Sequence, residues 1–193
     1  MYVPRHFDAS DPGRCHALIR AEPFGTLVAV DEAGAPFATH VPFLLDADRG
    51  PLGTLLGHVA RANPQWRLFS SRPVLALFQG PHAYVSPAWY EAHPSVPTWN
   101  YVAVHAYGVP ALVDDSARVK AMLGRLVEVN EAGRPDPWRF DALADDYVGG
   151  MLRGIVAFEI PLDRLEGKAK LSQNRGAGDR SRVRAALAGG DPV

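Results

Sequence analysis

The fold is decided by the stretch Gly25-Thr-Leu-Val-Ala-Val30, Asp31-Glu-Ala-Gly34 and Phe37-Ala-Thr-His-Val-Pro-Phe-Leu-Leu45. Two β-type runs joined by a short turn that contains glycine predict an antiparallel hairpin. Pro42 has no N–H to donate to a β ladder, so the returning strand is expected at an edge of the sheet or with a bulge at that point.

The same sequence pattern continues toward the C-terminus, where short apolar runs alternate with turn residues. Further strands are expected at Thr54–Val59, Arg72–Gln79, Ala83–Ser86, Trp99–Val113 (bent at Gly108 or Pro110) and Gly154–Ile160. No βαβ series alternates along the chain, which argues against a doubly wound parallel sheet. Short strands with glycine turns favour a closed or nearly closed antiparallel barrel, because closure removes exposed strand edges.

Helices are expected at the periphery of this β structure. Their predicted ranges are Pro12–Arg20, Ala60–Phe69, Ser116–Glu131, Ala142–Leu152 and Ser181–Ala188. Asp11 or Ser10 is expected to cap the first, and Asp114 or Asp115 the third. The sequence therefore predicts one mainly β (α+β) domain over residues 1–193, with peripheral helical additions at about 116–152 and 176–188.

Composition narrows the classes of function. The formal net charge is -1, so no global basic field attracts the chain to nucleic acid or to an anionic membrane. Cys15 is the single cysteine, which excludes an internal disulfide and a multi-cysteine zinc site. No apolar run reaches the ~20 residues of a membrane span, and Met1–Pro12 lacks the apolar stretch of a signal peptide. We expect a cytoplasmic protein without a membrane partner.

Motifs for metal or acid–base chemistry are missing from the sequence. The seven histidines are scattered, and none forms an HExxH pattern. No GxSxG elbow occurs either. The sequence therefore predicts no metal site and no catalytic residues.

A candidate phosphate cradle lies in Gly57-His-Val-Ala-Arg-Ala-Asn63, where a strand runs into a predicted helix start. His58, Arg61 and the Asn63 amide can all donate hydrogen bonds. The backbone N–H groups of a helix start also attract anions, and the guanidinium fork suits phosphate. The alternative is that Asn63 only caps the helix and that Arg61 is a solvated surface residue.

Two further segments carry the chemistry of a binding site. The first is Val96-Pro-Thr-Trp-Asn-Tyr-Val102. Its aromatic rings can stack on a flat heterocycle, and the Asn100 amide can form hydrogen bonds with the polar edge of that heterocycle. The alternative is core packing, with Asn100 closing a loop. Gly167-Lys-Ala-Lys-Leu-Ser-Gln-Asn-Arg175 is rich in donors and acceptors and either reaches into a neighbouring site or forms a solvated loop.

Six segments together resemble the FMN-binding negative transcriptional regulators of the PaiB type. They are Met1-Tyr-Val-Pro-Arg-His-Phe7, His40-Val-Pro-Phe-Leu-Leu45, Gly53-Thr-Leu-Leu-Gly-His-Val-Ala-Arg-Ala-Asn-Pro-Gln-Trp66, Phe78-Gln-Gly-Pro-His-Ala-Tyr-Val-Ser-Pro-Ala-Trp-Tyr90, Val96-Pro-Thr-Trp-Asn-Tyr101 and Leu165-Glu-Gly-Lys-Ala-Lys-Leu-Ser-Gln-Asn174. The resemblance spans nearly the whole chain, with the segments in the family's order. One departure is Ala169, where the family pattern has a larger, often aromatic residue.

The resemblance implies an antiparallel Greek-key split β-barrel, related to pyridoxamine phosphate oxidases, that binds FMN in a groove between the two subunits of a homodimer. Ring-side residues of this groove are implied at His40, Val41, Pro42 and Phe43, where backbone groups would face the flavin edge. Phosphate-side residues are implied at His58, Val59, Ala60, Arg61 and Asn63. The groove would be completed by Trp99, Asn100, Tyr101, Lys170, Ser172, Gln173 and Asn174, some of them from the second subunit.

The function implied by the family is negative regulation of transcription. The sequence itself does not support direct DNA binding, because the basic segment from Arg175 to Ala188 is typical of a solvated amphipathic helix. Two alternatives stay open. One is an FMN-dependent oxidoreductase, and the other is a haem-binding split barrel with His58, His82 or His105 as the axial ligand.

Overall fold

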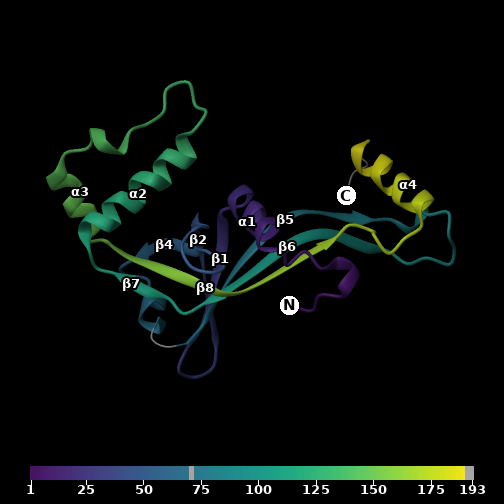
Figure 1. The fold of residues 1–193 in the computed structure, drawn as a ribbon, viewed down its shortest axis with the longest axis horizontal. Helices are drawn as coiled ribbons and strands as arrows, with labels where there is room; N and C mark the ends of the chain where they lie inside the picture. The colour runs from purple at the N-terminus through teal and green to yellow at the C-terminus, as the bar shows by residue number, and fades with distance from the viewer. Residues whose placement is uncertain (70–71, 190–193) are drawn as a thin grey trace. The chain divides into compact units, whose positions relative to one another are not determined.

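The structure, a computed structural model, describes residues 1–69 and 72–189 and contains an antiparallel sheet with four α-helices. The strands are β1 (Phe24–Val30), β2 (Pro36–Pro42), β3 (Leu44–Asp46), β4 (Thr54–Ala60), β5 (Val74–Val85), β6 (Thr98–Gly108), β7 (Ala111–Val113) and β8 (Ile155–Lys170). The helices are α1 (Pro12–Ala21), α2 (Ser116–Glu131), α3 (Asp145–Leu152) and α4 (Ala177–Ala188) (Figure 1). Short 3₁₀ turns lie at Arg5–Phe7, Pro64–Leu68, Pro87–Trp89 and Phe140–Ala142.

The sheet confirms the predicted split barrel. Seven of its eight strands follow the order β2-β1-β5-β6-β8-β4-β3, and the eighth, β7, pairs separately with β8. The two strands at the ends of this order, β2 and β3, are neighbours in the chain and only Phe43 separates them. β2 also contacts β4. We call the place where the two ends of the sheet approach each other the seam of the barrel. It lies beside β2, β3 and β4.

Two compact units can be distinguished. One contains Met1–Glu22, Leu77–His105 and the chain from Leu165 onward, and the other contains Pro23–Ala76 and Ala106–Arg164. We call them the terminal unit and the central unit. The single-domain organisation inferred from the sequence stays a prediction.

The opening hairpin has the predicted form. β1 and β2 pair from Phe24↔Pro42 to Val30↔Pro36. Gly34 closes the turn with a φ of +87°, a conformation that glycine adopts without a steric penalty. Pro42 is the last residue of β2, which is an end strand of the sheet, so the proline interrupts no interior ladder.

Local signals also located most helices. α1 begins after Asp11, whose carboxylate accepts a hydrogen bond from Arg14 N, and α2 begins after Asp115, which caps Ala117 N and Arg118 N. α4 begins four residues earlier than the sequence predicted. The predicted helix at 60–69 is only a 3₁₀ turn at Pro64–Leu68, and the predicted helix at 142–152 is a 3₁₀ turn followed by α3.

Two strand predictions were wrong because tertiary packing overrides local turn signals. β5 continues through Gly80 and Pro81, where a break was expected. A Cβ on Gly80 would lie 2.6 Å from the Leu18 side chain of α1, so the glycine allows the helix to pack tightly against an extended strand. β8 likewise extends to Lys170 instead of ending at Ile160, and converts the first part of the expected 167–175 loop into strand.

The core of the central unit is built around Phe158, which is fully buried. Its ring makes edge contacts with Phe43 and Phe69 at centroid distances of 6.4 and 5.0 Å. A Cβ on Gly57 would lie 2.9 Å from Phe158 Cζ, so β4 requires a glycine at that position. This packing fixes β2, β4 and β8 at the seam.

The helical addition of the central unit covers the opposite face of these strands. Val119 and Met122 of α2 pack against Leu44, Leu56 and Ala157. Figure 1 shows α2 and α3 next to each other beside β7, in agreement with their contacts. α2 therefore lies over the outer face of β3, β4 and β8.

Candidate functional site

Side chains alternate between the two faces at the seam of the central unit. On β2, Val41 and the following Phe43 are buried in the core, whereas His40 is exposed and Pro42 is half-buried. Alternate residues of a strand share a face, so the side chains of Val41 and Phe43 both point into the core. These two residues can therefore offer a ligand only their backbone groups. That a ligand contacts the backbone of this strand stays a prediction.

His40 lies on the exposed face of the hairpin. Its Nδ1 lies 3.1 Å from Thr26 Oγ1, and its ring stacks on Phe24 at a centroid distance of 6.0 Å. Phe24 itself is exposed. The outer face of β1 and β2 thus presents an imidazole beside an aromatic ring.

His58 occupies the outer face of β4, opposite Ala157 of β8. Among the described residues, its Nδ1 is buried and has no hydrogen-bond partner. Burial lowers the pKa of His58 below its usual value, because desolvation disfavours the charged form. Burial therefore favours the neutral ring, whose Nδ1 has no partner in the described part of the chain.

Arg61 directly follows β4 and is held in place by the loop before β8. Its Nε donates to Arg153 O and its Nη2 donates to Ile155 O, both at 2.8 Å. A guanidinium has five N–H groups, so three remain available. The side chain is exposed, as the alternative sequence interpretation expected, but its position is fixed.

A cavity of about 380 Å³ lies next to this arginine. Its walls include Trp66, Val119, Leu152 and Arg153 beside Arg61. Trp66 Nε1 donates to Arg61 O at 3.1 Å, so the tryptophan is tied to the same turn. The fixed guanidinium of Arg61 thus forms part of the wall of a cavity.

Asn63 acts as a cap in the structure. Its Oδ1 accepts from Gln65 N at 2.9 Å, and its Nδ2 donates to Thr39 Oγ1 of β2 at 2.9 Å. One amide hydrogen remains for a ligand. Of the other residues in this segment, Val59 is buried in the core and Ala60 is exposed.

The remaining predicted residues belong to the terminal unit, where β6 and the segment after β8 come together. Ser172 Oγ donates to Asn100 Oδ1 at 3.1 Å, and both residues are buried. Lys170 Nζ donates to Thr98 Oγ1. Ser172 has a φ of +64°, which is uncommon for a residue other than glycine and is enriched at functional sites.

Aromatic rings gather on the same strands. Trp99 is about half exposed, and its ring lies 6.2 Å from His82 and 5.9 Å from Tyr84 between centroids. Tyr101 is half-buried below Lys168 Nζ, which lies 5.2 Å from the ring centroid. Gln173 and Asn174 are exposed, and the Gln173 amide folds back onto Ala169 O and Leu171 N.

The described residues contain no cluster of three or more His, Cys, Asp or Glu side chains that could hold a metal ion. No helix in the described part of the chain is long and apolar enough to cross a bilayer.

A sequence model of the family described as "Putative FMN-binding domain" matches residues 1–164 of the chain. The chain belongs to this FMN-binding family. The resemblance and the cofactor expected from the sequence are thereby confirmed. Residues 170–174 lie outside the matched range.

Relatives extend over nearly the whole chain. The "Protease synthase and sporulation protein PAI 2" of Bacillus subtilis is 36% identical over 184 residues, which cover 95% of this chain and 87% of the relative. An uncharacterized protein of Emericella nidulans is also 36% identical, with 86% and 82% of the two chains covered.

Solved structures share the fold at low sequence identity. The flavocytochrome Anf3 of Azotobacter vinelandii has a TM-score of 0.68 at 15% identity and covers 93% of this chain and 78% of its own. The FAD- and haem-binding protein of Mycobacterium smegmatis has a TM-score of 0.65 at 17% identity, with 90% and 78% covered. These likenesses support the split barrel alone.

The residues at the seam fit the cofactor of the FMN-binding family. The buried, unpartnered Nδ1 of His58 and the three remaining N–H groups of Arg61 offer polar partners to a phosphate. Sequence reasoning did not assign Arg153 to this region, since it lies 92 positions from Arg61 and only the pairing of β4 with β8 brings the two together.

Proposed function

We propose that this member of the FMN-binding family holds the phosphate of FMN at Arg61 and His58 and places the flavin ring along the backbone of β2. The observation that carries the proposal is the unpartnered Nδ1 of His58 on β4 together with the guanidinium of Arg61 just after it, which two backbone carbonyls hold in place. A fixed guanidinium with several free N–H groups matches the oxygens of a phosphate.

The proposal includes a homodimer. The outer face of the hairpin exposes Phe24 and Val30 beside His40, a surface that a second copy would cover. Trp99, Asn100, Tyr101 and the segment Lys170–Asn174 would come from the second copy and complete the groove. In this arrangement the exposed ring of Trp99 is available to cover a flat heterocycle.

The biological role that we propose is regulation of transcription in the cytoplasm through the bound flavin, without direct contact to DNA. The Bacillus subtilis relative carries a name that refers to protease synthesis and sporulation. In this chain two of the C-terminal arginines are already engaged, since Arg182 pairs with Glu91 at 2.6 Å and Arg175 lies 4.2 Å from the centroid of the Tyr90 ring. This leaves a reduced basic surface on and beside α4.

The phosphate requirement gives the sharpest test of this proposal. Flavin-free protein is titrated with FMN and with riboflavin, which has the same ring but no phosphate, and binding is followed by quenching of flavin fluorescence. We expect FMN to bind about 10- to 100-fold more tightly, because charge-assisted hydrogen bonds to the phosphate contribute about 1.5–3 kcal/mol. Equal affinities for the two flavins would contradict the proposed phosphate site.

A further inference from the structure

A second group of basic side chains lies in the central unit, around a cavity of about 170 Å³ between α2 and the strands. Arg49 comes from the turn after β3, whereas Arg118 and Arg125 come from α2. Leu56 and Met122 form part of the apolar wall of the cavity. Arg61 does not line this cavity, so it is distinct from the proposed FMN site.

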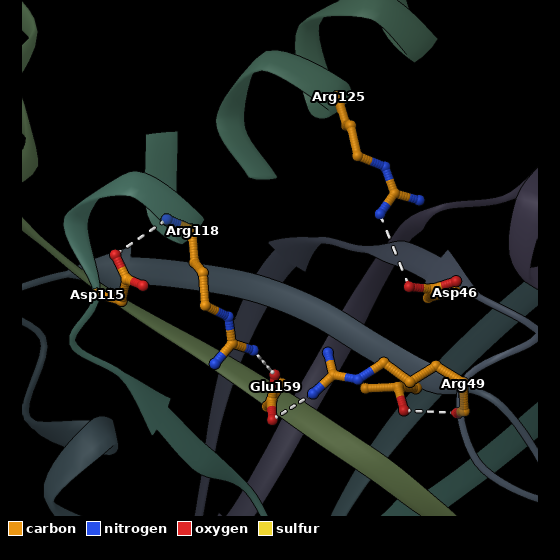
Figure 2. Close-up of polar contacts among 7 residues, drawn as sticks. Asp46, Arg49, Asp115, Arg118, Arg125 and Glu159 are labelled. Carbon is orange, nitrogen blue, oxygen red and sulfur yellow. Dashed lines mark hydrogen bonds and ion pairs between the residues drawn. The ribbon is translucent and has the colours of Figure 1, made fainter. Parts of the chain in front are cut away.

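The carboxylate of Glu159 orients two of these arginines. Arg49 Nη2 donates to one carboxylate oxygen at 2.7 Å, and Arg118 Nη2 donates to the other at 2.8 Å. Figure 2 shows the two guanidinium groups meeting at Glu159 from different elements. The Glu159 side chain is only 13% exposed, whereas those of Arg49 and Arg118 are 41% and 55% exposed. The carboxylate therefore orients one end of each guanidinium, and the rest of each group is open to water.

Arg125 has no comparable partner. Its nearest carboxylate oxygen, on Asp46, is 3.8 Å away, which is an ion-pair distance but too long for a hydrogen bond. Among the described residues that line the cavity, three arginines therefore face two carboxylates, Asp46 and Glu159, which leaves one excess positive charge.

We propose that this cavity binds the phosphate group of a small molecule other than the flavin. Arginine forks match the oxygens of a phosphate, and the bridging Glu159 orients two of them before the ligand arrives. Arg125 supplies the free donors and the excess charge. The apolar wall accommodates a short carbon chain attached to the phosphate.

The test measures binding of inorganic phosphate by calorimetry to the full chain saturated with FMN, at constant ionic strength set with chloride. Arg125→Gln is expected to weaken phosphate binding about tenfold or more. Asp46→Asn is expected to strengthen it severalfold, because the competing carboxylate is removed. Arg134→Gln makes the same charge change outside the cavity and is expected to leave the affinity unchanged.

The opposite responses of Arg125→Gln and Asp46→Asn separate a specific site from general attraction of anions. The absence of saturable phosphate binding, or equal affinities for Arg125→Gln and Arg134→Gln, would overturn the proposal. If Arg125→Gln does not fold, the Asp46→Asn variant alone decides: phosphate binding that is unchanged or weaker than in the parent would overturn the proposal. The phosphate affinities of the parent and the variants can also be compared on flavin-free protein. That comparison tests the phosphate cavity even if FMN does not bind at Arg61 and His58, because neither Asp46 nor Arg125 belongs to the proposed FMN site.

Discussion

Phe158→Ala is expected to lower the free energy of unfolding by about 3–5 kcal/mol. The ring is completely buried and lies between Phe43 and Phe69. It also fills the space over Gly57, where even a Cβ would come within 2.9 Å of the ring. Removing the ring leaves a cavity at the point where β2, β4 and β8 meet.

Urea denaturation of the parent and the variant measures this loss. Val129→Ala removes apolar atoms from a position of α2 that is 59% exposed, and it should change stability by only about 0.5 kcal/mol, as is usual for surface substitutions. A loss below about 1 kcal/mol for Phe158→Ala would mean that the seam is not organised around this ring.

Arg61→Gln should reduce the affinity for FMN about 10- to 100-fold, which corresponds to the loss of a charge-assisted interaction of about 1.5–3 kcal/mol. The fold should survive, because the two carbonyls that Arg61 contacts belong to Arg153 and Ile155, and the Arg153–Gly154 turn is exposed to water. Glutamine keeps much of the volume and the polarity while it removes the charge.

The matched control is Arg67→Gln on the neighbouring 3₁₀ turn. Arg67 is exposed and lies over the Trp66 ring, 5.3 Å from its centroid, but it does not line the cavity beside Arg61. Fluorescence titration with FMN should therefore separate the two variants, with Arg67→Gln close to the parent. Similar losses for both variants would indicate a general charge effect rather than a phosphate contact at Arg61.

The elements that the sequence predicted well are those whose determinants are local. The hairpin around Gly34, the α1 cap at Asp11 and the start of α2 after Asp115 each depend on residues within a few positions. The continuity of β5 through Gly80-Pro81 was missed because it depends on Leu18 of α1, which lies 62 positions before Gly80. The extension of β8 was missed because polar residues after Ile160 masked a strand that pairing stabilises.

In the candidate site, too, the sequence predicted only those groupings that depend on residues close together in the chain. His58, Arg61 and Asn63 share one short segment, so their grouping could be seen in the sequence, although the capping role of Asn63 emerged only as an alternative. The cavity partner Arg153 comes from a distant segment. The cluster of Arg49, Arg118 and Arg125 was not visible either, because α2 must first pack on β3, β4 and β8.

The most direct measurement of the central claim is the identity of the small molecule that leaves the native protein when it is purified without added cofactor and then denatured. Absorption spectroscopy and mass determination of the released molecule should identify FMN, at about one molecule per chain. Release of haem, or of no flavin from protein that also fails to bind added FMN, would contradict the account.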